Sequence, residues 1–222
     1  MQINTYNMKD CVIVLSGGVD SVTLLYEYRE RIGCALSFIY GANHNKKELE
    51  CAKYHCEQLN IEHIVINLDF IGKFFNSQLL GKEIAEYNGE RDIIHKSIVP
   101  FRNGIFLAVA CGFAESRKFK YVLIANHFGV IESMPDCTNK FIAGMNDAMR
   151  FGTLAEIEVL APYTDVSKSE IVKRGVANNL DYKQTYSCYK GNKNHCGKCK
   201  ACVERKEAFA DAGVDDPTEY EQ

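Results

Sequence analysis

The stretch Cys11-Val12-Ile13-Val14-Leu15-Ser16-Gly17-Gly18-Val19-Asp20-Ser21 decides the fold of this chain. Its first five residues are apolar and predict a buried strand, and the spacing of Val22, Leu25 and Tyr28 predicts a helix directly after the Gly-Gly turn. The glycines let the backbone turn sharply and bring its N–H groups close to an anion, and the helix N-terminus adds its positive dipole end. The sequence therefore predicts a phosphate-binding loop.

The predicted nucleotide-binding residues lie in this loop and at its borders: Leu15, Ser16, Gly17, Gly18, Val19, Asp20, Ser21 and Val22. Ser16 and Ser21 offer hydroxyl donors, whereas the Asp20 carboxylate is expected to hold a phosphate-bound Mg²⁺. Neither the Walker pattern nor Gly-x-Gly-x-x-Gly occurs here. A Gly-Gly turn joins strand to helix in many α/β proteins, but the flanking serines and aspartate favour phosphate binding. The loop resembles the PP-loop of the adenine-nucleotide α-hydrolase superfamily, which implies cleavage of ATP to AMP and pyrophosphate.

The composition suits one cytoplasmic domain with a small appendage. The chain has 222 residues, of which 46% are hydrophobic, so it can bury a sizeable core. Its net charge of −3 argues against a protein that is basic overall, although a local basic patch is compatible with it. The first ten residues are polar and predict no secretory signal, and no segment is expected to span a membrane.

Strand-like and helix-like segments alternate along the chain. Strands are predicted at 11–15, 35–40, 63–68, 121–125 and 158–161. Helices are predicted between and after them at 22–28, 46–59, 103–115 and 141–149, and a last helix carries Ile171, Val172 and Val176. Ser167 and Glu170 form a capping box for the last of these helices. Residues 70–98 are less regular and predict a mobile excursion. This order predicts an α/β fold, a Rossmann-like parallel sheet with flanking helices, whose ligands bind at the carboxyl ends of the strands.

Four cysteines near the C-terminus predict a metal site. A stretch of fifteen residues contains Cys188, Cys196, Cys199 and Cys202. Thiolates that are separated by two residues can bind one ion from a tight turn. Four thiolates favour one structural Zn²⁺ per chain, while an iron–sulfur cluster is the alternative. His195 is expected to be a neighbour rather than a ligand. The remaining cysteines are scattered, mostly in apolar segments, which fits a reduced compartment.

The sequence predicts two parts. Residues 1–182 form the ATP-binding α/β domain, and residues 183–222 form a small helical zinc-binding region packed on it. Lysines and an arginine crowd the second part, namely Lys183, Lys190, Lys193, Lys198, Lys200, Arg205 and Lys206. They form either a surface for nucleic acid or polyphosphate, or a solvated face that offsets the charge of the thiolates.

Three further stretches accompany the loop and the cysteines. They are residues 99–107 (Val-Pro-Phe-Arg-Asn-Gly-Ile-Phe-Leu), 135–137 (Pro-Asp-Cys) and 185–189 (Thr-Tyr-Ser-Cys-Tyr). From about residue 11 to residue 213, this combination closely resembles the preQ0 synthase (QueC) family of queuosine biosynthesis, and the joint occurrence of five motifs is highly specific.

The resemblance implies a ligase that forms carbon–nitrogen bonds on 7-carboxy-7-deazaguanine, with ATP and ammonia as co-substrates. Adenylation gives the carboxylate a leaving group, ammonia then forms the amide, and a second adenylation leads to the nitrile. The family carries one structural zinc per chain and is often dimeric, so we expect a homodimer without nucleic acid.

Carried over by position, the resemblance implies catalytic roles for Asp20, Ser21 and Arg102. Arg102 would stabilise the charge of a phosphate or carboxylate, or it is a surface residue at a helix N-terminus. The substrate-binding residues would be Tyr40, Arg102, Asn103, Asn126 and Asp136, although Asp136 is equally compatible with a turn after Pro135. The zinc ligands would be the four cysteines named above.

The chain departs from the family pattern on the substrate side. Asn43 stands where the family has arginine, Phe101 where it has alanine, and residues 126–134 differ from the usual loop. These differences leave two variants open, one that stops at the amide and one that passes the activated carboxylate to another amine. Two other classes are a PP-loop enzyme that modifies tRNA and a nucleotide-binding regulator that is not an enzyme.

Overall fold

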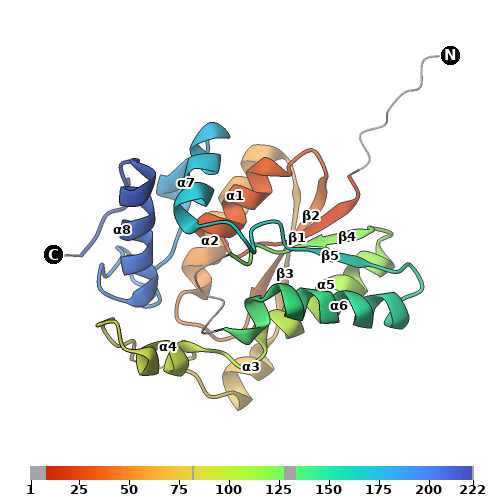
Figure 1. Cartoon of the computed structure of the whole chain (residues 1–222), viewed down its shortest axis with the longest axis horizontal. Coiled ribbons are helices and arrows are strands. Elements are labelled where there is room, and N and C mark those ends of the chain that lie inside the picture. The colour runs from red at the N-terminus through yellow and green to blue at the C-terminus, as the bar shows by residue number, and fades with distance from the viewer. Residues whose placement is uncertain (1–8, 82, 128–133, 222) are drawn as a thin grey trace.

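Five parallel strands form one sheet in the order β3-β2-β1-β4-β5 in this computed structural model, which describes residues 9–81, 83–127 and 134–221 (Figure 1). The strands are β1 (Cys11–Val14), β2 (Ile32–Ile39), β3 (Glu62–Asn67), β4 (Tyr121–Leu123) and β5 (Glu158–Leu160). Ile13 of β1 lies opposite Ala35 of β2 and Leu123 of β4. The strand order reverses between β1 and β4, and open α/β sheets bind their ligands at such a point.

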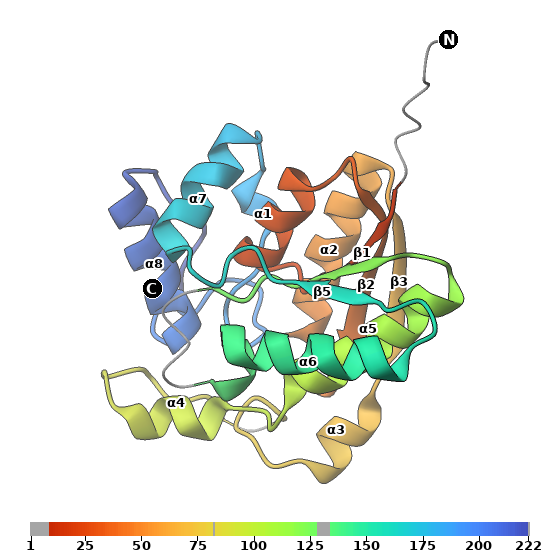
Figure 2. The ribbon, with the colours of Figure 1, turned by 45° about the vertical axis from the view of Figure 1, so that its right-hand side comes forward.

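Helices cover both faces of the sheet (Figures 1 and 2). The long helices are α1 (Val19–Glu27), α2 (Asn45–Leu59), α5 (Arg102–Ser116), α6 (Asn139–Gly152), α7 (Lys168–Ala177) and α8 (Lys200–Ala212), and short 3₁₀ helices span Pro135–Cys137 and Tyr182–Gln184. Cys11 and Ile13 pack in one cluster with residues of α1, α2 and α7, whereas Val12 packs in another with residues of α5 and α6. Because both faces are covered, β1 is apolar throughout and does not alternate with polar residues. The predicted α/β fold is confirmed.

Residues 70–98 correct one expectation in part: residues 75–81 and 83–90 contain no helix or strand, as predicted, but the segment also contains two short helices and packs into the core. They contain most of α3 (Asp69–Phe74) and all of α4 (Arg91–Ser97), and Leu79, Leu80 and Ile84 are buried in the core. Gly41 and Gly72 let this segment approach the end of β2 closely, since a Cβ on Gly41 would lie 2.8 Å from the Gly72 Cα. The short helices lack the long apolar period from which an element is recognised in a sequence.

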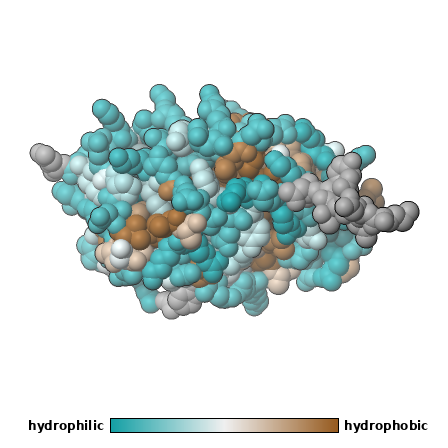
Figure 3. All heavy atoms as spheres, turned by 90° about the horizontal axis from the view of Figure 1, so that it is seen from above, coloured by the Kyte–Doolittle hydropathy of each residue, from teal (hydrophilic) through white to brown (hydrophobic). Residues whose placement is uncertain are grey.

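Residues 91–116 are the one described stretch that is long and apolar enough to cross a membrane, which the sequence did not lead us to expect. Half of its most apolar window is buried inside the protein. The stretch is also divided, because Phe101 has a φ of 53° and α5 begins at Arg102. α5 is therefore a core helix. On the face in Figure 3, hydrophilic side chains predominate and apolar ones form a few separate patches.

The side chain of Arg205 forms hydrogen bonds that connect the C-terminal part, residues 183–222, to the rest of the fold. This α8 side chain is fully buried. Its Nε donates to Asp216 at 3.1 Å, its Nη1 to the Thr185 hydroxyl at 2.8 Å, and its Nη2 to the Tyr182 carbonyl at 3.1 Å. A buried guanidinium needs such partners, because burial of an unpaired charge is costly. The bonds to Asp216 and Thr185 lie within the predicted second part, and the bond to the Tyr182 carbonyl crosses the predicted border and joins the two parts.

Replacing Arg205 by Met should lower the free energy of unfolding by about 3–5 kcal/mol, because it leaves Asp216 partly buried without its cation. Urea unfolding of the zinc-loaded protein measures this difference. The neighbouring exposed Lys206→Met is the matched control and should cost about 1 kcal/mol or less. Equal stability of the two variants would contradict the role of Arg205.

Candidate functional site

The predicted phosphate loop connects β1 to α1 at the carboxyl end of the sheet. Gly17 has a φ of 92°, and a Cβ there would overlap with the backbone carbonyl of Glu48, so only glycine fits. The Ser21 hydroxyl accepts from the backbone N–H groups of Ser16 at 3.2 Å and Gly17 at 3.3 Å. The Ser16 hydroxyl accepts from Gly18 N at 3.2 Å. The two serines therefore shape the loop as well as offering hydroxyl groups.

Asp20, in the first turn of α1, forms ion pairs with two basic side chains of the site. Its Oδ2 lies 3.3 Å from Lys168 Nζ and 3.7 Å from His127 Nε2. Burial opposes ionisation, but the charges of Lys168 and His127 hold the pKa of Asp20 below its usual value. Oδ1 is buried and has no hydrogen-bond partner among the described residues. A bare carboxylate oxygen beside a phosphate-binding loop fits a Mg²⁺ ligand.

Lys168 is a site residue that the sequence analysis missed. It follows Ser167, whose predicted capping box with Glu170 holds in part because the Ser167 hydroxyl accepts from Glu170 N at 3.2 Å. Burial would lower the pKa of Lys168, but Asp20 and Glu204 raise it above its usual value, so the ammonium stays charged. The lysine that follows the cap residue at the start of α7 was the available signal.

One cavity adjoins the loop and gathers most of the predicted site. Its walls come from the ends of β1, β2 and β4, the first turns of α1, α2 and α5, and residues 186–189 with α8. The predicted residues that line it are Leu15, Ser16, Gly18, Val19, Asp20, Ser21, Tyr40, Arg102, Asn103 and Asn126. Gly17 and Val22 are not among its lining residues, and Val22 is fully buried in the core.

Arg102 heads a chain of polar side chains along one wall. Its Nη1 donates to the Tyr40 hydroxyl at 3.3 Å, and that hydroxyl lies 3.4 Å from His44 Nε2. His44 Nε2 in turn lies 3.7 Å from Glu48 Oε2. Burial opposes the charge of Arg102, but Tyr40 and other neighbours raise its pKa above its usual value. The cation therefore lines the same cavity as the phosphate loop and Lys168.

Asn103, Asn126 and Asp136 meet where the strand order reverses. Asn103 Nδ2 donates to Asn126 Oδ1 at 3.4 Å and to the Asp136 carbonyl at 3.1 Å. The Asp136 carboxylate accepts from Asn103 N at 3.0 Å, so it satisfies a free N–H group at the start of α5. The two amides thus line the cavity, and Asp136 supports them from behind. Within the altered stretch 126–134, residues 128–133 lie outside the described part.

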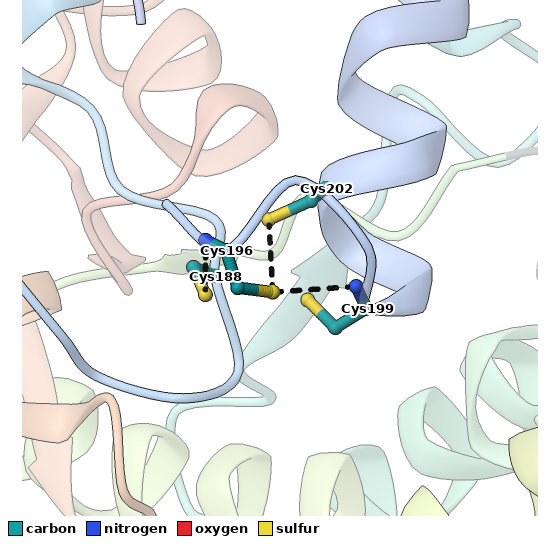
Figure 4. Close-up of side chains that lie close together, drawn as sticks. All are labelled: Cys188, Cys196, Cys199 and Cys202. Atoms are coloured by element: carbon teal, nitrogen blue, oxygen red, sulfur yellow. Dashed lines mark hydrogen bonds between the residues drawn. The ribbon is translucent and has the colours of Figure 1, made fainter. Parts of the chain in front are cut away.

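The four cysteines lie together, as predicted (Figure 4). All are buried, and their sulfur atoms lie within 4.8 Å of one another. Four sulfurs at about 2.3 Å from a tetrahedral Zn²⁺ would be about 3.8 Å apart, and Cys196 Sγ and Cys202 Sγ are 4.0 Å apart. Backbone N–H groups donate to these sulfurs, including Cys196 N to Cys188 at 3.3 Å. The arrangement fits a closed zinc site.

His195 is a neighbour of this cluster, because its Nε2 accepts from Ser187 N at 3.0 Å. The same segment reaches the phosphate loop, where Tyr186 N donates to the Gly17 carbonyl at 3.1 Å. Tyr186, Ser187 and Tyr189 line the cavity together with Glu204 of α8. The cysteine region therefore builds one wall of the site. Glu204, which accepts from Lys200 at 2.7 Å, is a second residue that the sequence analysis missed.

Known proteins resemble the chain over nearly its whole length. The family model described as queuosine biosynthesis protein QueC matches residues 10–213. A 7-cyano-7-deazaguanine synthase of Porphyromonas gingivalis is 53% identical over 96% of this chain and 98% of its own. A protein of the same name from Desulfotalea psychrophila is 41% identical over 96% of this chain and 99% of its own.

Two solved structures share the fold at 15% sequence identity. NMN synthetase from Francisella tularensis has a TM-score of 0.55, with 94% of this chain and 79% of that chain covered. A 4-thiouridine synthetase in complex with RNA and bound ATP has a TM-score of 0.51, with 91% of this chain and 51% of that chain covered. The fold, the loop, the cysteine site and the full-length family match agree: the chain belongs to the QueC family of queuosine biosynthesis proteins.

Proposed function

We propose that this chain converts 7-carboxy-7-deazaguanine, ATP and ammonia into 7-cyano-7-deazaguanine, AMP and pyrophosphate. The observation that carries this proposal is one cavity lined by both the phosphate loop with Asp20 and Arg102, in a chain 53% identical to a 7-cyano-7-deazaguanine synthase. An anion-binding loop and a separate cation suit a reaction that joins ATP to a second anionic substrate. This pairing favours carboxylate activation over ATP binding alone.

The loop provides the means of activation. The oxygens of a free carboxylate are poor leaving groups, and adenylation replaces one of them with AMP. The loop N–H groups would hold the phosphates, and Lys168 would add a positive charge where pyrophosphate leaves. Mg²⁺ held by Asp20 Oδ1 would neutralise phosphate charge. Catalysis then comes from positioning and charge stabilisation, without a covalent nucleophile of the protein.

The wall that carries Arg102, Asn103 and Asn126 would hold the second substrate. The Arg102 guanidinium matches a carboxylate in geometry and charge, and the Tyr40 hydroxyl orients it. The amides of Asn103 and Asn126 would pair with the edge of the deazaguanine. Phe106, which stacks on Phe38 with ring centroids 4.4 Å apart, offers an apolar surface in the same cavity. The substrate carboxylate would thus lie between the arginine and the ATP phosphates.

Zinc would fix the position of residues 186–189, which form a further part of the cavity wall. Cys188 directly follows Tyr186 and Ser187, so a bound zinc ion would restrain the segment that is hydrogen-bonded to Gly17.

Two further proposals concern the whole protein: a cytoplasmic location and a homodimer. The exposed Val65 on the edge strand β3 and the nearby exposed Phe70 and Phe74 are compatible with contact between two copies.

Incubation with 7-carboxy-7-deazaguanine, ATP, Mg²⁺ and ammonium should give the nitrile, with two AMP and two pyrophosphate per product. Mass spectrometry of the base distinguishes the outcomes. Accumulation of the amide would show that the reaction stops early. An unchanged base, with the protein folded and loaded with zinc, would refute the proposed function.

Asp20→Asn should reduce pyrophosphate release at least 10²-fold, because it removes the charge that is directed at the phosphate-bound metal. A coupled pyrophosphate assay measures the rate, and circular dichroism with zinc analysis shows that the fold persists. Asp211→Asn, on the exposed face of α8, is the control and should keep full activity. Near-normal release from Asp20→Asn would mean that the loop works differently.

Cys199→Ser should lower zinc content and thermal stability together, because metal binding contributes to the folding free energy. It should also raise the KM for ATP, since the zinc region is hydrogen-bonded to the phosphate loop. Cys51→Ser lies outside the cluster and should keep its zinc. A metal-free Cys199→Ser protein of unchanged stability would argue against a structural site.

A further inference from the structure

Glu48 is a carboxyl group in the cavity wall that the proposed function leaves without a role. It lies on α2, one turn after His44, and its side chain is only 17% exposed. Among the described residues, no lysine or arginine nitrogen lies within 4 Å of it, and His44 Nε2 at 3.7 Å is its only ionisable basic neighbour at that range. Burial raises the pKa of Glu48 to about 8, although the charge of Arg102 opposes this.

The groups that face Glu48 do not supply a cation next to it. Burial lowers the pKa of His44 to about 4, with Arg102 adding to this effect, so the imidazole is neutral at neutral pH. Tyr40 and Tyr189 are held neutral by burial, which raises the pKa of each phenol. The pKa of Cys51, one turn further along α2, is likewise raised to about 12 by burial. The surroundings of Glu48 are therefore acceptors and neutral groups, with the charge of Arg102 further away.

The position of Glu48 connects it with the substrate carboxylate. The chain Arg102, Tyr40, His44 and Glu48 has successive contacts of 3.3, 3.4 and 3.7 Å. Arg102, at one end, is the proposed carboxylate ligand, and Glu48 lies at the other end in the same cavity. The backbone of Glu48 also touches the phosphate loop at Gly17. A small ligand beside Glu48 would thus lie near both the acyl group and the phosphates.

A small cation suits this place. An opposite charge within about 4–6 Å of a carboxyl group favours its ionised form, so a cation that enters would ionise Glu48. The proposed reaction has one such co-substrate, because ammonia is present mainly as ammonium at neutral pH. Ammonium has only donors, and the Glu48 carboxylate, the Tyr40 hydroxyl and an unprotonated nitrogen of His44 can accept them.

We propose, on the basis of the proposed function, that Glu48, Tyr40 and His44 form the ammonium subsite and that Glu48 is the base that accepts a proton from ammonium. Proton transfer from NH₄⁺ to the carboxylate leaves NH₃ and a neutral carboxyl group. The nitrogen lone pair then forms the C–N bond to the acyl carbon. The C–O bond to AMP breaks, and its electron pair leaves on the phosphate oxygen. The remaining extra proton on nitrogen passes to solvent, which gives the amide.

Formation of the nitrile from the amide also requires a base, and Glu48 is placed to act as that base. After the amide oxygen is adenylated, the nitrogen must lose its protons while the C–O bond to AMP breaks. The electron pair of an N–H bond becomes part of the third C–N bond. Glu48 as carboxylate would accept one of these protons, and solvent would accept the other.

Glu48→Gln keeps the shape of the side chain and removes the base, which tests this assignment. With ammonium, formation of amide and nitrile at neutral pH should fall about 10²-fold or more. Exchange of labelled pyrophosphate into ATP, in the presence of carboxydeazaguanine and without ammonium, should stay within about threefold of the unmodified protein. Hydroxylamine is largely uncharged at neutral pH, so hydroxamate formation should also stay within about threefold.

Glu50→Gln, on the exposed side of the same helix, is the matched control and should behave like the unmodified protein. Glu48→Asp, which retains a carboxylate set further back, should lose ammonium-dependent turnover in part and keep the hydroxylamine reaction. It serves as the test if the glutamine variant does not fold. An equal loss with hydroxylamine and ammonium in a folded variant, or unimpaired turnover with ammonium, would overturn the assignment. Absence of exchange in the unmodified protein would instead refute the proposed function.

Discussion

The close approach of α2 to the loop at Gly17 is the contact on which the site depends. The missing side chain of Gly17 leaves room for the Glu48 carbonyl, and the carbonyl of Gly17 accepts from Tyr186 N. The loop after β1, helix α2 and the segment before the cysteines are therefore all in contact at Gly17. Any larger residue there would overlap with the backbone of α2 at Glu48 and Ala52 and would force the phosphate loop and this helix apart.

Two carboxyl groups in this cavity have opposite properties. Lys168 and His127 lie next to Asp20 and lower its pKa, whereas Glu48 has no lysine or arginine within 4 Å among the described residues and burial raises its pKa. Enzymes obtain different roles from like side chains in this way, because the environment sets the charge. One group suits a metal-bound phosphate, and the other suits proton transfer.

The cysteine region contributes residues to the wall of the candidate site. Arg205 joins α8 to Thr185 and Tyr182, and the cysteines begin one residue after Ser187. A zinc site at this place would hold residues 186–189 against the loop and present Glu204 to Lys168. The contacts of residues 182–189 with the phosphate loop and with α8 pack the cysteine region and the α/β part into one unit.

The sequence by itself determined the parallel α/β fold and the cysteine cluster and predicted the phosphate loop, because each follows from neighbouring residues: a repeated period, Cys-x-x-Cys spacing, and an apolar run before Gly-Gly. The sequence did not indicate Lys168, Glu48 or Glu204 as residues of the site. It also did not indicate the short helices within residues 70–98, because that segment lacks a long periodic pattern. Only the tertiary structure decided which charges face one another and which carboxyl group is ionised. Those properties depend on burial and on partners from distant segments, as in the pair Asp20 and Lys168, and no local pattern encodes them.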